Sequence, residues 1–318
     1  MRALAIVSLI FVLALVSVSA YLRLDNSGIG CAGWPECYAM IGAPTAEEPT
    51  VGSTYERLAV EAQEPLSWAT PVHRLVASVL GLLVLGMALL SLRARRDRFL
   101  SFVLLGLTVF LAWLGIYSGG LHSPAVVMGN LGGGFTMLGL LGWMVFRDAR
   151  PRANASFRVR RWVVAALALL SVQIALGGLT SANFAATACM SVPDCHGTWL
   201  PGADLMKAFD LTREHEISPS GLAIGGGERA DIHKLHRLVA VAALLVALIA
   251  GGLAALGRMG ATAFVVIALV ALEFCVGVAA ILTDLPIGVA VAHNWLAAIL
   301  LLGLLRLLAL CRNRQALL

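Results

Sequence analysis

The chain has 318 residues, of which 59% are hydrophobic and 13% are charged, and its mean hydropathy is +0.88. This composition excludes a water-soluble globular protein, which needs a larger share of charged residues on its surface. The net charge of +5 comes mainly from arginines in short loops between apolar segments, so the chain also lacks the continuous basic surface of a nucleic-acid-binding protein.

Eight apolar segments run through the chain, each close to the length of about 20 residues that crosses a bilayer. They cover residues 3–21, 71–92, 99–118, 124–146, 162–180, 233–256, 261–282 and 287–310. Lipid offers the backbone no hydrogen-bond partners, so each segment must be a helix. The sequence therefore predicts an all-α integral membrane protein with eight transmembrane helices, arranged as two tandem pseudo-symmetric four-helix bundles.

Arginines gather in the loops on one side of this arrangement. They occur within 93–98 and 147–161, at position 258 and in the tail at 312–314, all on the same side as Arg2. The positive-inside rule makes this side cytoplasmic. We therefore expect a multi-pass protein of the bacterial cytoplasmic (inner) membrane, with both termini in the cytoplasm and the long loops 22–70 and 181–231 in the periplasm.

The first apolar segment has two interpretations. Met1-Arg2, the apolar run and Val18-Ser19-Ala20 also fit a cleavable signal peptide. However, residues 3–21 precede Cys31 as residues 162–180 precede Cys189, so cleavage would remove one helix from a repeat. We expect a retained membrane span.

Each long outer loop begins with a cysteine pair that brackets a proline. Cys31 and Cys37 form the first pair, and Cys189 and Cys195 follow them by 158 residues. Disulfides persist in the periplasm, so an intraloop disulfide is expected in each loop, with a redox-active dithiol as the alternative. The repeat divides the chain into residues 1–150 and 151–318.

Histidines mark the outer ends of three predicted spans. His73-Arg74 and His236-Arg237 are related by an offset of 163 residues, and His293 lies about two turns into the last span. Polar residues inside a membrane are costly unless they have partners, and they are functional by default. Two imidazoles that face each other across helices can ligate haem iron from both sides. We therefore predict haem ligation by His236 and His293.

Other polar residues near the spans have more than one interpretation. Arg74 and Arg237 lie at a depth where a guanidinium binds a haem propionate, but snorkelling to the lipid headgroups explains them equally well. His233 is expected to be a wet interfacial residue, with support of the haem ligand or a proton relay as alternatives. Glu273, within the seventh span, is expected to line the bundle or relay protons. The remaining histidines lie in outer loops and are expected to be solvated: His122, His196 and His215.

The order and spacing of these motifs resemble the haem A synthase family over almost the whole chain. The matching segments include Tyr21–Cys31, Trp34–Cys37, Gly177–Asn183, Ile232–Arg237 and Ala292–Asn294. The resemblance implies a haem b cofactor, held by His236 and His293 in the half 151–318. It also implies a haem O substrate in the half 1–150, where a ring methyl group is oxidised to the formyl group of haem A.

Two positions of the N-terminal half depart from the family pattern. Thr70 stands where the family has a glutamate, three residues before His73, and Asn130 stands at the second histidine position. The latter placement has internal support, because Asn130 precedes His293 by the same 163 residues. Asparagine is a poor iron ligand, and threonine cannot act as a carboxylate base. The substrate site is therefore expected to be altered.

The expected function is that of a haem-dependent oxidoreductase that converts haem O to haem A for terminal oxidase biogenesis, with His73 as the catalytic residue. One alternative is a membrane protein that binds haem b for electron transfer or oxidase assembly without hydroxylating a substrate. Another alternative is a transporter, which tandem repeats and intramembrane polar groups also suit. The expected partners are an unidentified electron donor, haem O synthase and oxidase assembly factors, with homo-oligomerisation as a further option.

Overall fold

The computed structural model describes residues 1–25, 68–95, 97–117, 124–149, 156–213, 216–217, 223–224 and 226–311. All eight predicted membrane helices are confirmed. They are α1 (Arg2–Asp25), α4 (Ala69–Ala94), α5 (Arg98–Tyr117), α6 (Pro124–Phe146), α7 (Phe157–Ala182), α8 (Gly227–Leu256), α9 (Ala261–Leu282) and α10 (Ile287–Leu310). The predicted Cys31–Cys37 disulfide and the outer histidines His122 and His215 lie outside the described residues.

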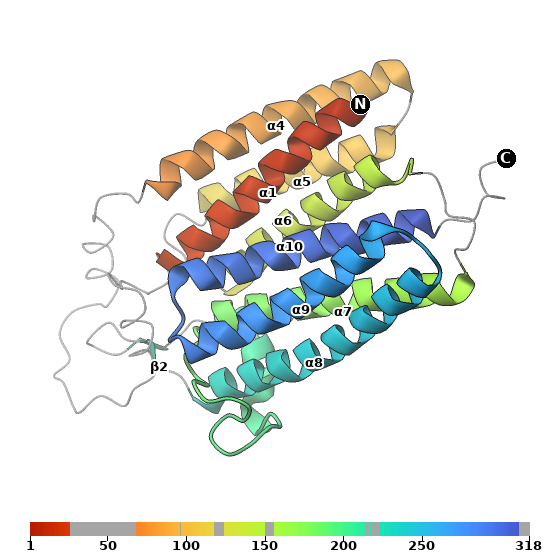
Figure 1. Cartoon of the computed structure of the whole chain (residues 1–318). Helices are drawn as coiled ribbons and strands as arrows, with labels where there is room; N and C mark the ends of the chain where they lie inside the picture. Colours follow the sequence, from red (N-terminus) through yellow and green to blue (C-terminus); the bar gives the residue numbers. More distant parts are fainter. Residues whose placement is uncertain are drawn as a thin grey trace.

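The segment between α7 and α8 contains three short elements. The 3₁₀ helix η1 (Ala203–Phe209) packs against α8. Strands β1 (Glu216–Ile217) and β2 (Ala223–Ile224) pair antiparallel, with Glu216 opposite Ile224 and Ile217 opposite Ala223. In Figure 1 this segment lies at one end of the helices, while the start of α1 and the end of α10 lie at the other.

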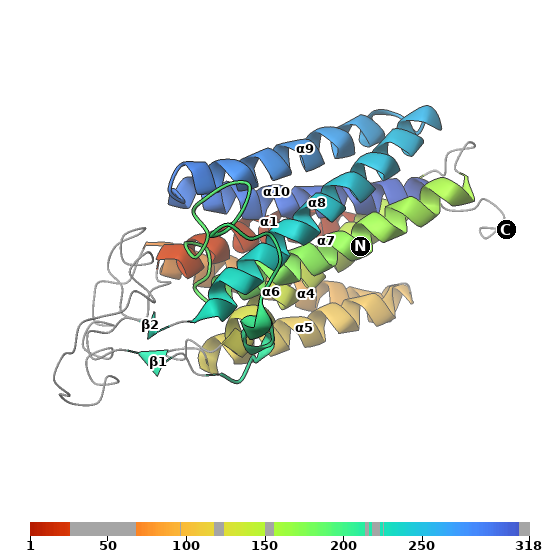
Figure 2. The same cartoon turned by 90° about the horizontal axis from the view of Figure 1, so that it is seen from below.

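The helices pack in two groups of four. In the first group α1 and α5 each contact α4 and α6, and in the second group α7 and α9 each contact α8 and α10. The groups meet through α1 with α10, α6 with α10, and α6 with α7. Figures 1 and 2 show the helices side by side along a common direction. This pairing agrees with two tandem bundles, and the assignment of substrate to 1–150 and cofactor to 151–318 remains a prediction.

Helix α1 is an integral part of the packed interior. Val12 and Val16 are buried in the shared core, and the Ser8 hydroxyl lies 3.7 Å from the sulfur of Met87 on α4. Removing α1 would expose this surface of α4, α6 and α10, all of which it contacts. The packing supports its interpretation as a retained span.

Helix α8 begins at Gly227, six residues before the predicted span 233–256. Hydropathy placed the start too late because the first turns of α8 are polar. Glu228, Arg229 and Asp231 are nevertheless buried, with relative exposures of 3%, 7% and 4%. They are surrounded by protein, so a helix start rich in charge is stable there. His236 consequently lies more than two turns into α8, not at its beginning.

Candidate functional site

His236 lies against helix α7 inside the second helix group. The Nε2 atom of Gln173 on α7 lies 3.1 Å from Nδ1 of His236 and 3.4 Å from its Nε2. Gly177, one turn further along α7, allows this close approach. A Cβ atom at Gly177 would lie 3.2 Å from Cε1 of His236. A polar residue and a glycine of α7 therefore orient the imidazole ring.

His293 has a similar setting between α10 and α9. Its Nδ1 atom lies 3.2 Å from Oε1 of Glu273 on α9. Gly277, one turn after Glu273, faces the ring, and a Cβ atom there would lie 2.9 Å from Cε1 of His293. That separation is shorter than real Cβ contacts, so even an alanine would force the ring or the helix to shift.

The two histidines therefore share one local arrangement. In the pairs α7–α8 and α9–α10, the first helix supplies a polar residue and, four residues later, a glycine. Both residues contact a histidine of the second helix. Helices α7 and α9 each contact both α8 and α10, so the two helices that carry the histidines belong to one four-helix group. The structure thus places the two histidines that the sequence singled out on helices of the same four-helix group. Sequence reasoning missed Gln173 and both glycines, although the spacings Gln173–Gly177 and Glu273–Gly277 carried a signal.

Several polar atoms around the two rings are buried without a hydrogen-bond partner in the described part of the chain. They are Oε1 of Gln173, Oε2 of Glu273, Nδ1 of His293 and Nδ2 of the adjacent Asn294, the contact of His293 with Glu273 being an ion pair and not a hydrogen bond. Buried polar atoms are normally paired, so such atoms are expected where a bound group completes a site. Among the described residues, no group of three or more His, Cys, Asp or Glu could hold a metal ion. Haem fits this donor set, because the porphyrin brings its own nitrogens and needs only two axial histidines.

His233 has a structural role that the sequence did not predict. Its side chain is buried, with a relative exposure of 5%, and Nδ1 lies 3.0 Å from the carbonyl oxygen of Ala185. The expectation of a wet interfacial residue is wrong, because the segment after α7 folds over this face of α8. His196 in the outer segment is exposed, and its Nε2 lies 2.9 Å from the carbonyl oxygen of Ala188.

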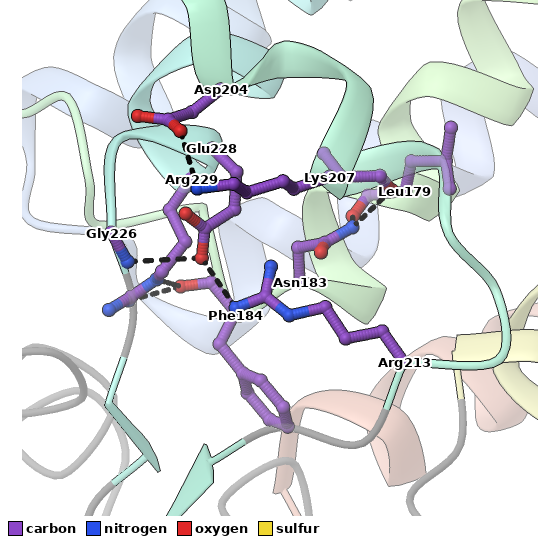
Figure 3. A network of polar contacts seen from close by, with 10 residues as sticks. Leu179, Asn183, Phe184, Asp204, Lys207, Arg213, Gly226, Glu228 and Arg229 are labelled. Atoms are coloured by element: carbon purple, nitrogen blue, oxygen red, sulfur yellow. Dashed lines mark hydrogen bonds and ion pairs between the residues drawn. The ribbon is translucent and has the colours of Figure 1, made fainter.

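A polar network fixes the outer end of α8, as Figure 3 shows. Arg213 forms an ion pair of 2.9 Å with the buried Glu228, which also accepts a hydrogen bond from the backbone of Gly226. Arg229 donates to the carbonyl oxygen of Phe184 just after α7. Asn183 donates to the carbonyl oxygens of Leu179 and Ala208. The network ties α7, η1 and α8 together and so sets the position of His236.

Two exposed groups on the same outer segment have shifted pKa values. The Asp204 carboxylate, which lies 2.7 Å from Nζ of Lys207, raises the pKa of that ammonium group by hydrogen bonding and charge. Hydrogen bonds from the hydroxyl and backbone of Thr212 lower the pKa of Asp210. Both pairs face solvent and therefore contribute little to the fold.

Arg237 binds the loop that the second cysteine pair closes. Cys189 and Cys195 form the predicted disulfide. The Arg237 guanidinium donates through Nη1 to the carbonyl oxygens of Ser191 and Asp194, at 2.7 and 3.2 Å, and through Nη2 to that of Cys189. Because Arg237 follows His236 directly, it connects the disulfide loop to the histidine. The predicted propionate contact of Arg237 remains a prediction.

The predicted substrate residues lie in the first helix group. Thr70 and His73 are half-buried in the first turns of α4, and Arg74 is exposed beside them. Asn130 is half-buried in α6, nearly two turns from its start. Helices α4 and α6 are separated by α1 and α5, as α8 and α10 are separated in the second group. The glycines beside Asn130 serve helix packing, since Gly133 faces Leu111 of α5.

Comparison with known proteins adds independent information. Residues 2–305 match the family model COX15-CtaA, described as cytochrome oxidase assembly protein. A haem A synthase of Shewanella oneidensis is 33% identical over 308 residues, which cover 94% of this chain and 92% of that protein. Haem A synthases of Caulobacter sp. strain K31 and Rhizorhabdus wittichii are each 26% identical, over 92% and 93% of this chain and over 90% and 89% of their own lengths.

The Arg237 contacts generate a testable prediction. Replacing Arg237 with lysine leaves a single ammonium group for three carbonyl oxygens, so the loop 189–195 should open more often. Reduction of the Cys189–Cys195 disulfide by an added thiol should become severalfold faster, since each hydrogen bond to a charged group contributes about 1.5–3 kcal/mol. The measurement is mass-spectrometric mapping of the thiol label at Cys189 and Cys195, which separates these two residues from the other four cysteines of the chain. Arg213→Lys is the matched control, and equal rates in both variants would contradict the prediction.

Proposed function

Because the chain belongs to the COX15-CtaA family of cytochrome oxidase assembly proteins, we propose that it is a haem A synthase that binds haem b between His236 and His293. In this proposal the C-terminal half holds the cofactor, and the N-terminal half receives haem O. The product is haem A, for use in a terminal oxidase. The protein acts in the bacterial cytoplasmic membrane, with the cysteine loops in the periplasm.

The paired setting of His236 and His293 is the observation that carries the proposal. Both rings come from opposite helices of one group, and each has one polar neighbour and one glycine beside it. A contact at Nδ1 leaves Nε2 of His293 available as an axial ligand. Both histidine side chains are half-buried among apolar helices, and that of His293 has a relative exposure of 33%. When bound, haem b supplies one-electron chemistry at its iron.

The N-terminal half has fewer ligands to offer the substrate. His73 is the histidine that would bind haem O, and Asn130 would leave the opposite face of the ring without an imidazole. Thr70 can orient a group by hydrogen bonding but cannot remove a proton as a carboxylate would. These two residues favour the second candidate function, a haem b protein without hydroxylase activity. The products of the reaction decide between the two functions.

Substitution of the axial histidines tests the cofactor site. His236→Ala and His293→Ala should each abolish the low-spin absorption spectrum of a bis-histidine haem, because one iron ligand is lost. The measurement is the Soret and α-band spectrum per mole of detergent-purified protein after haem-replete expression. His196→Ala, in the exposed outer segment, is the control and should leave the spectrum unchanged. Absence of a Soret band in the unsubstituted protein would refute both haem functions and favour the transporter.

Extraction of haems after co-expression with a haem O source tests the reaction. The unsubstituted chain should yield haem A or its hydroxylated precursor, and His73→Ala should reduce this product at least tenfold while the haem b spectrum persists. Separation by chromatography and mass spectrometry provides the measurement. Recovery of haem B and haem O alone from the unsubstituted chain would instead establish the haem b protein without hydroxylase activity.

The glycine beside His293 provides an independent test of the site. Gly277→Ala should reduce haem content and perturb the low-spin spectrum, because a Cβ atom there meets the imidazole at 2.9 Å. Gly252→Ala in α8 is the matched control, since nothing lies within 4 Å of a Cβ atom at that position. Equal haem content in the two variants would argue against a tightly seated His293 ring.

A further inference from the structure

The two proposed iron ligands differ in the group that faces their rings. Gln173 presents a neutral amide to His236, whereas Glu273 presents a carboxylate to His293. The surroundings are otherwise alike, because each polar residue lies four residues before the glycine that contacts the ring. Within this shared arrangement, the polar group is an amide beside His236 and a carboxylate beside His293.

Glu273 needs an explanation because of its depth. It lies in the middle of α9, and its side chain has a relative exposure of 14%. A carboxylate inside a membrane is costly unless a partner compensates for it. Within the described part of the chain, the ion-pair contact of Glu273 is His293, with Oε1 of Glu273 at 3.2 Å from Nδ1, while Oε2 of Glu273 and Nδ1 of His293 have no hydrogen-bond partner. The geometry therefore directs the carboxylate toward the histidine.

A carboxylate near Nδ1 is a common neighbour of a histidine that binds a metal. A neutral imidazole that binds iron through Nε2 carries its proton on Nδ1, and a hydrogen-bond acceptor there fixes the ring orientation. A carboxylate acceptor makes the imidazole a stronger electron donor than a neutral acceptor does. Rotating the Gln173 amide by half a turn brings its unpartnered Oε1 to Nδ1 of His236, where it acts as the neutral counterpart.

We propose that Glu273 is a positioning residue that accepts a hydrogen bond from the Nδ1–H group of His293 when haem b is bound, and that this hydrogen bond lowers the reduction potential of the haem. This inference rests on the proposed haem site. The stronger donor ligand stabilises the ferric state relative to the ferrous state. Gln173 orients His236 without this electronic effect. The two axial ligands are therefore unequal, with Glu273 setting the potential at which the cofactor half exchanges electrons.

Exchange of the two polar groups tests the proposal. Glu273→Gln should raise the reduction potential, by roughly the 59 mV that corresponds to a tenfold change in a one-electron equilibrium. Gln173→Glu should lower it, because it adds a carboxylate on the opposite side. The double variant Gln173→Glu/Glu273→Gln restores the number of carboxylates and should return toward the original potential. Potentiometric titration followed in the α band provides the measurement, and the Soret amplitude reports haem content.

The outcomes separate this proposal from the haem site on which it rests. A normal bis-histidine spectrum with an unchanged potential in Glu273→Gln would overturn the role of Glu273 and leave the haem site intact. Absence of haem from the unsubstituted protein would overturn the site itself. If Glu273→Gln fails to retain haem, the Gln173→Glu variant tests the electronic effect instead. A lowered reduction potential of the haem in Gln173→Glu would support the effect, and an unchanged potential would overturn it. Gln173→Leu, which cannot accept the Nδ1 proton, controls for general disturbance of the ring.

Discussion

A polar side chain in a membrane-spanning helix is costly unless it has a partner within the protein, because lipid provides none. This constraint explains the organisation of the second helix group. At the membrane interior it places Gln173 and Glu273 beside His236 and His293. At the outer end it pairs charged residues with each other or with backbone carbonyl oxygens, as in Arg237 and the disulfide loop. The segment between α7 and α8 is thus connected to the site. Its contacts fix the first turns of α8, which precede His236 on the same helix.

The sequence predicted the eight helices well, because each must present a long apolar surface to lipid whatever its neighbours are. Six of the eight begin within two residues of the predicted span, whereas α7 and α8 begin five and six residues earlier. In both cases polar residues precede the apolar run, and hydropathy does not distinguish a charge buried in protein from one in solvent. The histidines and Glu273 were also recognisable, since intramembrane polar residues are rare. Their partners were not, because which helices are neighbours depends on tertiary packing.

The offset of 163 residues allows the two halves to be compared position by position. It relates α5 to α9 and α6 to α10, since both pairs of helices begin at positions that differ by this number. The unit that seats His293 in the second half consists of a carboxylate, a glycine and the histidine itself. At the corresponding positions of the first half, all three members are replaced: Phe110, Leu114 and Asn130 stand for Glu273, Gly277 and His293.

The replacement of Gly277 by Leu114 also changes the packing around Asn130. In the second half, the glycine leaves room for the imidazole of α10 against α9. In the first half, the larger Leu114 packs against Gly129, next to Asn130, because a Cβ atom at Gly129 would lie 2.7 Å from Cδ2 of Leu114. At the position that corresponds to Glu273 the first half has Phe110, so Asn130→His alone would supply an imidazole without its carboxylate. The first half therefore lacks the counterpart of the carboxylate, glycine and histidine beside the proposed cofactor, and under the proposed function the substrate there would depend on His73.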